Sequence, residues 1–164
     1  MGPFVFSDIH QAKCELISLG LPAELAIDFG PTFRPQYINY CAKNGAENTL
    51  AIDAHKAVLD DGIDFHRADF SRDSIVDWVE DYRGEHPGDC LGISFDTLLH
   101  QYSPLHVLMN LLGVLDRACI GSPILKDRDS EALFLPAILD KDQGGLFPKK
   151  WMTRELNAPV DSRF

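Results

Sequence analysis

The chain has 164 residues, which fits one domain with an ordinary hydrophobic core. Its apolar fraction of 45% separates it from disordered chains, and its formal net charge of −10 argues against binding to nucleic-acid phosphates. Four cysteines stand far apart with no CxxC pair, and the first ten residues lack the basic segment of a secretory signal. We therefore predict a cytoplasmic protein whose thiols are outside disulfides.

In the first half of the chain, segments that begin with proline or a capping residue and end at glycine predict a series of short helices. We expect helices over residues 7–20, 22–30, 35–45 and 46–62. The segment TLAIDA within the last of these could alone form a short strand. The sequences LAIDFG and TLAIDAH look alike, but a single short similarity does not indicate a repeat architecture, and we interpret it as chance.

The second half of the chain also favours helices. An acidic helix is predicted over 71–83, and after a loop the apolar spacing predicts another over 90–102, with a strand LGISF as the alternative. Residues 104–120 are apolar around most of a helical circumference, which is typical of a helix at the centre of a core, yet they are too polar to span a bilayer. A further helical segment, broken at Pro136, is predicted over 129–139.

Few segments alternate with period two, so the predicted fold class is mainly α. We expect a compact single-domain bundle of short helices around the buried helix of residues 104–120, with a small α+β fold as the alternative. The helical domain is predicted to span residues 1–143. Glycine and proline punctuate residues 144–164, which predicts an extended arm that packs on the domain or is partly disordered.

The sequence contains none of the familiar catalytic signatures, including GxGxxG, the phosphate-binding loop and HExxH. Its nearest approach to a nucleophile elbow, GISFD, has Asp96 where the second glycine should stand. The histidines His55, His66 and His86 lie near carboxylates and could bind a divalent ion if they converged, but their spacing matches no ligand pattern. We therefore predict no metal, no cofactor and no catalytic residue. A small metal-dependent hydrolase is the alternative.

Negative charge is concentrated in residues 60–89, which hold ten acidic residues against three arginines. Within the predicted helix 71–83, carboxylates form one stripe, while Trp78 and Tyr82 share the opposite, apolar side and are expected to anchor it to the core. Like charges at this spacing destabilise an isolated helix by about 0.2–0.5 kcal/mol per pair. The stripe is either a solvated face that maintains solubility or a docking surface for a basic partner.

The functional hypothesis follows from the second interpretation. We predict a non-enzymatic protein that neutralises a basic protein partner, in the manner of an immunity protein or antitoxin that blocks a nuclease-like toxin domain. An adaptor component of a larger assembly is a further alternative. We expect no nucleic-acid and no membrane partner, and the sequence leaves the oligomeric state open. The predicted partner-binding residues are Asp64, Phe65, Asp69, Phe70, Asp73, Asp77, Glu80, Asp81 and Glu85.

Overall fold

The structure is a computed structural model, which describes residues 9–31, 35–55, 59–69, 74–95, 110–111, 113–125, 132–141 and 151–155. Helices and strands alternate along much of the described chain. Their bounds, in chain order, are α1 (Ile9–Gly20), β1 (Ala23–Phe29), α2 (Gln36–Lys43), β2 (Ala46–Asp53), β3 (Asp64–Arg67), α3 (Ile75–Glu85), β4 (Cys90–Ser94), β5 (Arg117–Leu125), β6 (Ala132–Lys141) and β7 (Trp151–Glu155).

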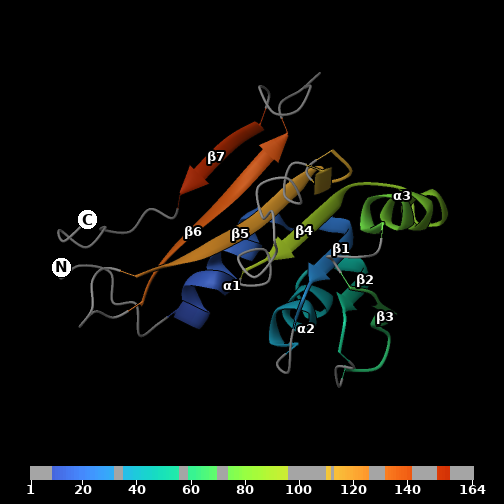
Figure 1. Ribbon diagram of the computed structural model, residues 1–164, viewed down its shortest axis with the longest axis horizontal. Helices are drawn as coiled ribbons and strands as arrows, with labels where there is room; N and C mark the ends of the chain where they lie inside the picture. The colour runs from blue at the N-terminus through green and yellow to red at the C-terminus, as the bar shows by residue number, and fades with distance from the viewer. Residues whose placement is uncertain are drawn as a thin grey trace.

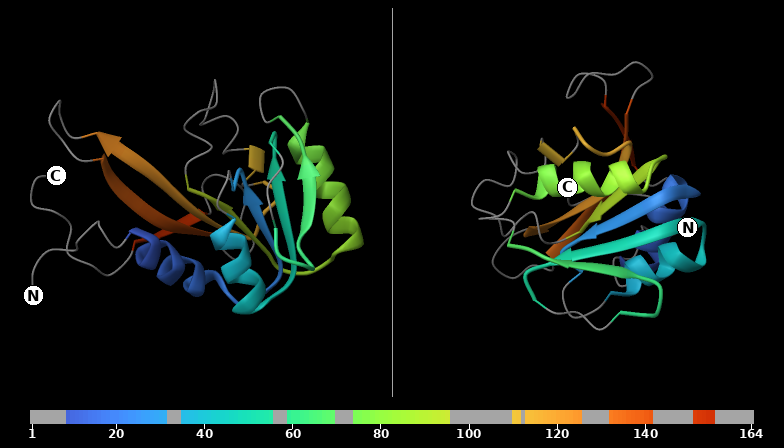
Figure 2. Two further views of the ribbon diagram at one scale, coloured as in Figure 1. Left: turned by 90° about the horizontal axis from the view of Figure 1, so that it is seen from below. Right: turned by 90° about the vertical axis from the view of Figure 1, so that its right-hand side faces the viewer.

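The strands form one sheet in the order β3-β2-β1-β4-β5-β6-β7 (Figure 1). Strands β3, β2, β1, β4 and β5 are parallel, and β6 and β7 each run antiparallel to the strand before them. Helices α1 and α2 cover one face of the sheet and α3 covers the other (Figure 2). The fold is therefore a doubly wound α/β sheet extended by two antiparallel strands.

This architecture shows that the predicted helical bundle is wrong, and so is the α+β alternative. The helices predicted over 7–20, 35–45 and 71–83 are confirmed as α1, α2 and α3, with shifted ends. The described residues of the other predicted helices lie mostly on strands, and their remaining residues lie outside the described ranges. In the central segment 104–120, residues 110–111 are helical, but β5 begins at Arg117.

The strand alternatives for residues 49–54 and 91–95 are confirmed by β2 and β4. The C-terminal arm, residues 144–164, is described only over 151–155, where the chain forms β7 against β6. The division into a domain at 1–143 and an arm at 144–164 stays a prediction.

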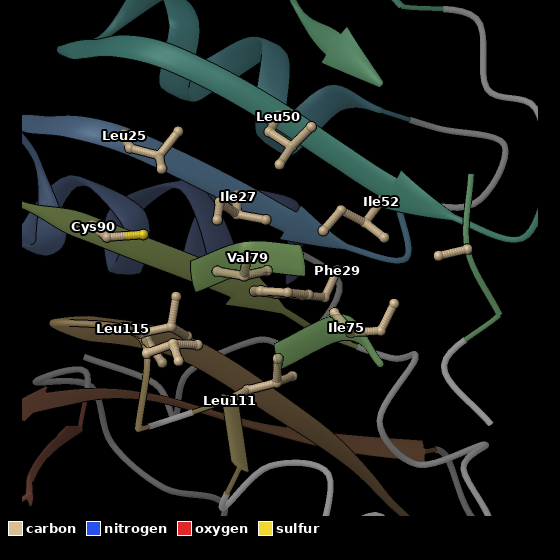
Figure 3. Close-up of a cluster of buried hydrophobic side chains, with 13 residues drawn as sticks. Leu25, Ile27, Phe29, Leu50, Ile52, Ile75, Val79, Cys90, Leu111 and Leu115 are labelled. Carbon is tan, nitrogen blue, oxygen red and sulfur yellow. The ribbon is translucent and has the colours of Figure 1, made fainter. Parts of the chain in front are cut away.

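The hydrophobic core has two layers, one on each face of the sheet. The layer under α3 contains the alternate β1 residues Leu25, Ile27 and Phe29, together with Ile75 and Val79 of α3 (Figure 3). Half-buried Trp78 and Tyr82 pack against it, which confirms the expectation that they anchor the acidic helix. The layer under α1 and α2 includes, among others, Leu16, Ile17, Ala26, Ile38, Cys41, Leu91 and Ile93.

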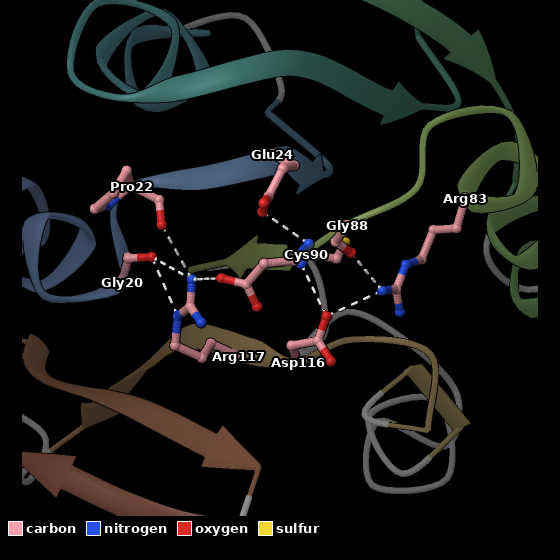
Figure 4. Close-up of polar contacts among 9 residues, drawn as sticks. Gly20, Pro22, Glu24, Arg83, Gly88, Cys90, Asp116 and Arg117 are labelled. Atoms are coloured by element: carbon pink, nitrogen blue, oxygen red, sulfur yellow. Dashed lines mark hydrogen bonds and ion pairs between the residues drawn. The ribbon is translucent and has the colours of Figure 1, made fainter.

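Two arginines hold the amino ends of β1, β4 and β5 together, on the edge of the sheet where these strands begin. From α3, Arg83 donates to the carbonyl oxygen of Gly88 at 2.9 Å and to Asp116 Oδ2 at 3.0 Å (Figure 4). It also donates to the carbonyl oxygen of Val114 at 2.6 Å. The same Asp116 oxygen accepts the backbone N–H of Cys90 at 2.9 Å. Asp116 thus links α3 to the first residue of β4.

The second arginine, Arg117 at the start of β5, donates from Nε and Nη2 to the carbonyl oxygen of Gly20 at 3.1 and 2.7 Å. It also forms an ion pair with Asp89. The Asp89 backbone N–H in turn donates to Glu24 Oε2 at 2.8 Å (Figure 4). We call Arg83, Arg117, Asp89 and Asp116 the arginine clasp, because they join the starts of three strands.

None of the four cysteines forms a disulfide, and Cys41, Cys90 and Cys119 are buried. Burial raises the pKa of the Cys90 thiol to about 12, and burial also raises that of Cys41 far above its usual range. A thiolate is therefore disfavoured at both positions at neutral pH, so neither thiol has the lowered pKa of a catalytic cysteine.

These shifts predict that the protein loses stability in alkali. The thiols ionise in the unfolded chain above a pKa of 9.0 but stay protonated in the folded one, so their stabilising contribution is complete below pH 9 and falls as the pH rises towards 12. Each thiol contributes about 1.4 kcal/mol per pH unit in that window. Urea unfolding between pH 8 and 10.5 measures the slope, which Cys90→Ala should reduce by one thiol's share. An identical slope in wild type and Cys90→Ala would contradict this.

Candidate ligand site at the carboxyl edge of the sheet

The carboxyl ends of the parallel strands meet at one edge of the sheet, opposite the arginine clasp. From β1 the chain first adds β2 and β3 on one side and then crosses to add β4 and β5 on the other. The strand order therefore reverses between β1 and β4. In open α/β sheets, ligands bind outside the carboxyl ends of the strands at such a switch point.

The end of β1 carries a buried carboxylate and a sharp turn. Asp28 is buried within the strand, and Gly30 follows directly after it ends, with φ of 82°. This left-handed conformation favours glycine, because a Cβ would clash with the backbone. The Gly30 N–H donates to the carbonyl oxygen of Ile52 at 2.7 Å, so the turn is joined to β2. A backbone without a side chain at this edge permits close approach of a ligand.

The end of β2 places a second carboxylate beside that turn. Phe29 is opposite Ile52 in the register, so the next pair along is Gly30 and Asp53. Asp53 is buried, and its Oδ1 accepts the backbone N–H of His55 at 3.0 Å, which fixes its orientation. Its two oxygens offer about four lone-pair sites, so the carboxylate can accept several hydrogen bonds at once.

A buried lysine lies near the end of β4. Lys13 of α1 is 6% exposed, and its Nζ lies 5.1 Å from the ring centroids of both Tyr37 and Phe95. The two rings pack edge to face with centroids 5.1 Å apart. This cation–π arrangement holds a positive charge next to Phe95, the residue that follows β4.

Ser94, the last residue of β4, is 5% exposed. Its hydroxyl oxygen has no hydrogen-bond partner within the described part of the chain. Ile93 is opposite Asp28 in the register, so Ser94 lies level with Phe29 on the neighbouring strand. A buried polar side chain thus stands at the switch point itself.

Most of the residues predicted to bind a partner lie outside this edge. Asp77, Glu80, Asp81 and Glu85 are exposed on α3, while Asp64 is exposed on β3 and accepts the Tyr82 hydroxyl at 2.5 Å. Phe65 is half-buried in β3, and Phe70 and Asp73 lie outside the described residues. The structure brings Asp69 to the carboxyl edge, two residues beyond β3. That these side chains bind a basic protein stays a prediction.

The histidines near carboxylates do not form a metal centre in the described ranges, where no group of three or more potential ligands converges. His66 instead stacks on Trp78 with ring centroids 3.8 Å apart. Trp78 stacks on Tyr82 at 5.2 Å, and Tyr82 on His86 at 4.2 Å. His66 and His86 are therefore at opposite ends of a stack of four rings, too far apart to share an ion.

Sequence patterns alone did not assign Lys13, Asp28, Gly30, Asp53 or Ser94 to a ligand site. A signal for Asp28 and Asp53 was present, because LAIDFG and TLAIDAH are apolar runs that each reach an aspartate. Those runs are β1 and β2, adjacent parallel strands whose aspartates lie near the same edge. Lys13 and Ser94 carried no comparable signal, since their position depends on tertiary packing.

Within the described residues, no helix combines the length and the apolar character that a bilayer crossing requires.

Comparison with known proteins relates the chain to solved structures through its fold. No family model and no curated protein sequence matches it. A Plasmodium falciparum protein assigned as a ribosomal RNA methyltransferase aligns with a TM-score of 0.51 and 12% identity, over 70% of this chain and 78% of that chain. Human N-acetylserotonin methyltransferase in complex with SAM (TM-score 0.47, 15% identity) aligns over 77% of this chain and 38% of that chain. HcgC from Methanococcus maripaludis, cocrystallised with SAH and pyridinol (TM-score 0.42, 14% identity), aligns over 77% and 58%.

These findings correct the predicted function. A helical immunity protein or antitoxin is inconsistent with a doubly wound sheet, and the Plasmodium protein that shares this fold is assigned as a methyltransferase, not as a hydrolase or an adaptor. The prediction of a non-enzymatic protein is contradicted to the extent that the chain has the fold of a protein assigned as an enzyme. At 12% identity the likeness shows the fold alone, which is the α/β fold found in a methyltransferase.

Proposed function

We propose that the protein is a methyltransferase that binds S-adenosylmethionine at the carboxyl edge of its sheet. The observation that carries this proposal is the buried carboxylate of Asp53 at the end of β2, directly beside the left-handed Gly30 at the end of β1. In doubly wound sheets, an acidic residue at this position accepts hydrogen bonds from ribose hydroxyls. The fold shared with a protein assigned as a methyltransferase supports the choice of chemistry.

The residues at the edge fit a nucleoside-containing methyl donor. Asp53 would hold the ribose hydroxyls, and Gly30 would let the donor approach the backbone. The chain departs from the glycine-rich pattern of dinucleotide sites, because Pro31, Thr32 and Phe33 follow Gly30. Contact at this turn therefore depends on one glycine. When bound, the donor supplies a methyl group activated by the positive sulfur.

The protein's own part is to position the reactants and to exclude water. The His55 N–H fixes the Asp53 carboxylate, so little side-chain entropy is lost when hydroxyls bind. Burial of the carboxylate removes competing water and strengthens each hydrogen bond it accepts. Lys13 places a positive charge on the α1 side of this edge, which favours an anionic group on the donor or the acceptor.

We propose that the methyl acceptor belongs to a class other than nucleic acids. A net charge of −10 is unfavourable for contact with phosphates, although the Plasmodium protein is assigned to ribosomal RNA. Labelled methyl transfer from S-adenosylmethionine to purified RNA at physiological salt would contradict the proposed acceptor class.

We also propose a cytoplasmic location, which the absence of disulfides among the four cysteines supports.

Binding of S-adenosylhomocysteine, the expected product, tests the proposal. Isothermal titration calorimetry should show binding to the wild-type protein, and Asp53→Asn should weaken it roughly 10- to 150-fold, because hydrogen bonds to a charged group contribute about 1.5–3 kcal/mol. Asp81→Asn removes the same charge from the exposed face of α3 and should leave the affinity unchanged. Wild-type protein that shows no binding would end the proposal.

A further inference from the structure

The hydroxyl of Ser94 is a buried polar group at the proposed donor site. Side chains of a strand alternate between the two faces of its sheet, so Ser94 faces the same way as Cys90 and Gly92. Cys90 belongs to the core layer under α3, and a Cβ built on Gly92 would meet Leu115 and Phe29. The Ser94 hydroxyl therefore points to the α3 side of the sheet, at the end where β4 stops.

Its described surroundings on that side cannot satisfy it. Level with Ser94 on β1 is Phe29, which is apolar and faces the same core layer. The hydroxyl oxygen is buried and has no hydrogen-bond partner in the part of the chain that is described. Folded proteins pair the large majority of buried polar side-chain atoms, and an unpaired one destabilises the protein that contains it. At a ligand-binding edge, the missing partner is available from a bound molecule.

We propose that Ser94 is a donor-binding residue whose hydroxyl forms a hydrogen bond with a polar atom of the bound methyl donor. This assignment rests on the proposed function above. Leu50 and Ile52 of β2 face the α3 layer, so Asp53 faces the α1 and α2 side. Asp53 and Ser94 then contact the donor from the two opposite faces of the sheet, on either side of β1.

The experiment measures stability and ligand binding on the same variant, because the two readouts should change in opposite directions. Ser94→Ala removes an unpaired buried hydroxyl and should raise the Tm of the ligand-free protein by about 2–4 °C. The same variant should bind S-adenosylhomocysteine roughly three- to tenfold more weakly, by calorimetry, because it lacks the hydrogen bond formed in the complex.

Ser18→Ala is the matched control. Ser18 lies near the C-terminal end of α1, away from the carboxyl edge, and its hydroxyl is hydrogen-bonded to the Cys14 carbonyl oxygen at 3.0 Å and to the Tyr40 hydroxyl. This variant should lower the Tm slightly and leave the affinity unchanged.

The possible outcomes test the assignment of Ser94 separately from the proposed function. Wild-type binding with unchanged affinity in Ser94→Ala overturns the assignment of Ser94 and leaves the proposed function intact. A lowered Tm in Ser94→Ala also overturns it, because the hydroxyl would then have a partner within the protein. Absence of binding to the wild-type protein overturns the proposed function, and the assignment with it.

Discussion

Replacing Phe29 with alanine is expected to lower the free energy of unfolding by about 3–5 kcal/mol. The ring is 2% exposed and lies in the core layer under α3. A Cβ built on Gly92 would stand 3.2 Å from Phe29 Cε2, so the ring packs directly against the backbone of β4. Because ladder hydrogen bonds fix β1 and β4, the strands cannot move together to fill the cavity.

Urea unfolding followed by circular dichroism measures this loss, with Leu19→Ala as the control. Leu19 is 52% exposed on α1, and its truncation should change stability by no more than about 0.5 kcal/mol. A loss below about 1 kcal/mol in Phe29→Ala would show that the site collapses around the smaller side chain and that the packing at the end of β1 is not as described.

Asp116→Ala is expected to cost about 2–4 kcal/mol, the second-largest effect. One carboxylate oxygen accepts hydrogen bonds from both Arg83 and the backbone N–H of Cys90, and alanine removes both. Cys90 is fully buried, so its N–H would be left without a partner, and that alone costs about 1–3 kcal/mol. The Arg83 ion pair adds less, because both side chains are partly exposed, at 26% and 33%.

Two further variants separate these contributions. Asp116→Asn keeps an acceptor for the Cys90 N–H but removes the charge, so its loss should be clearly smaller than that of alanine. Asp81→Ala, on the exposed face of α3, should be nearly neutral. Equal losses in Asp116→Asn and Asp116→Ala would assign the effect to the ion pair and contradict the role given to the Cys90 N–H.

The part of the fold that the sequence predicted is the set of helices with one solvated side. The acidic stripe of α3 opposite Trp78 and Tyr82 is such a pattern, and it placed the helix and its buried face correctly. The strands were missed because a parallel strand covered on both faces reads as a continuous apolar run, without alternation. In β1, for example, Ala26 and Ile27 are both fully buried, on opposite faces. Short runs of this kind fit a buried helix equally well.

The candidate site could be predicted even less, because its residues come together only through sheet topology. Asp28 and Asp53 are 25 positions apart in the sequence, and their nearness at one edge follows from the parallel pairing of β1 with β2. The conspicuous local feature, the acidic stripe, lies mostly elsewhere. The orphaned hydroxyl of Ser94 is a property of its burial, which no pattern of neighbouring residue types reveals.

The arginine clasp and the proposed donor site lie at opposite ends of the same strands. Arg83 and Arg117 secure β1, β4 and β5 where they start, so the anchoring of these strands does not draw on the residues near Asp53 and Ser94 where they end. Substitutions that retune ligand preference can therefore accumulate at one rim while the opposite rim preserves the scaffold. Such a separation would let a lineage with this architecture diversify its chemistry without first acquiring compensating mutations.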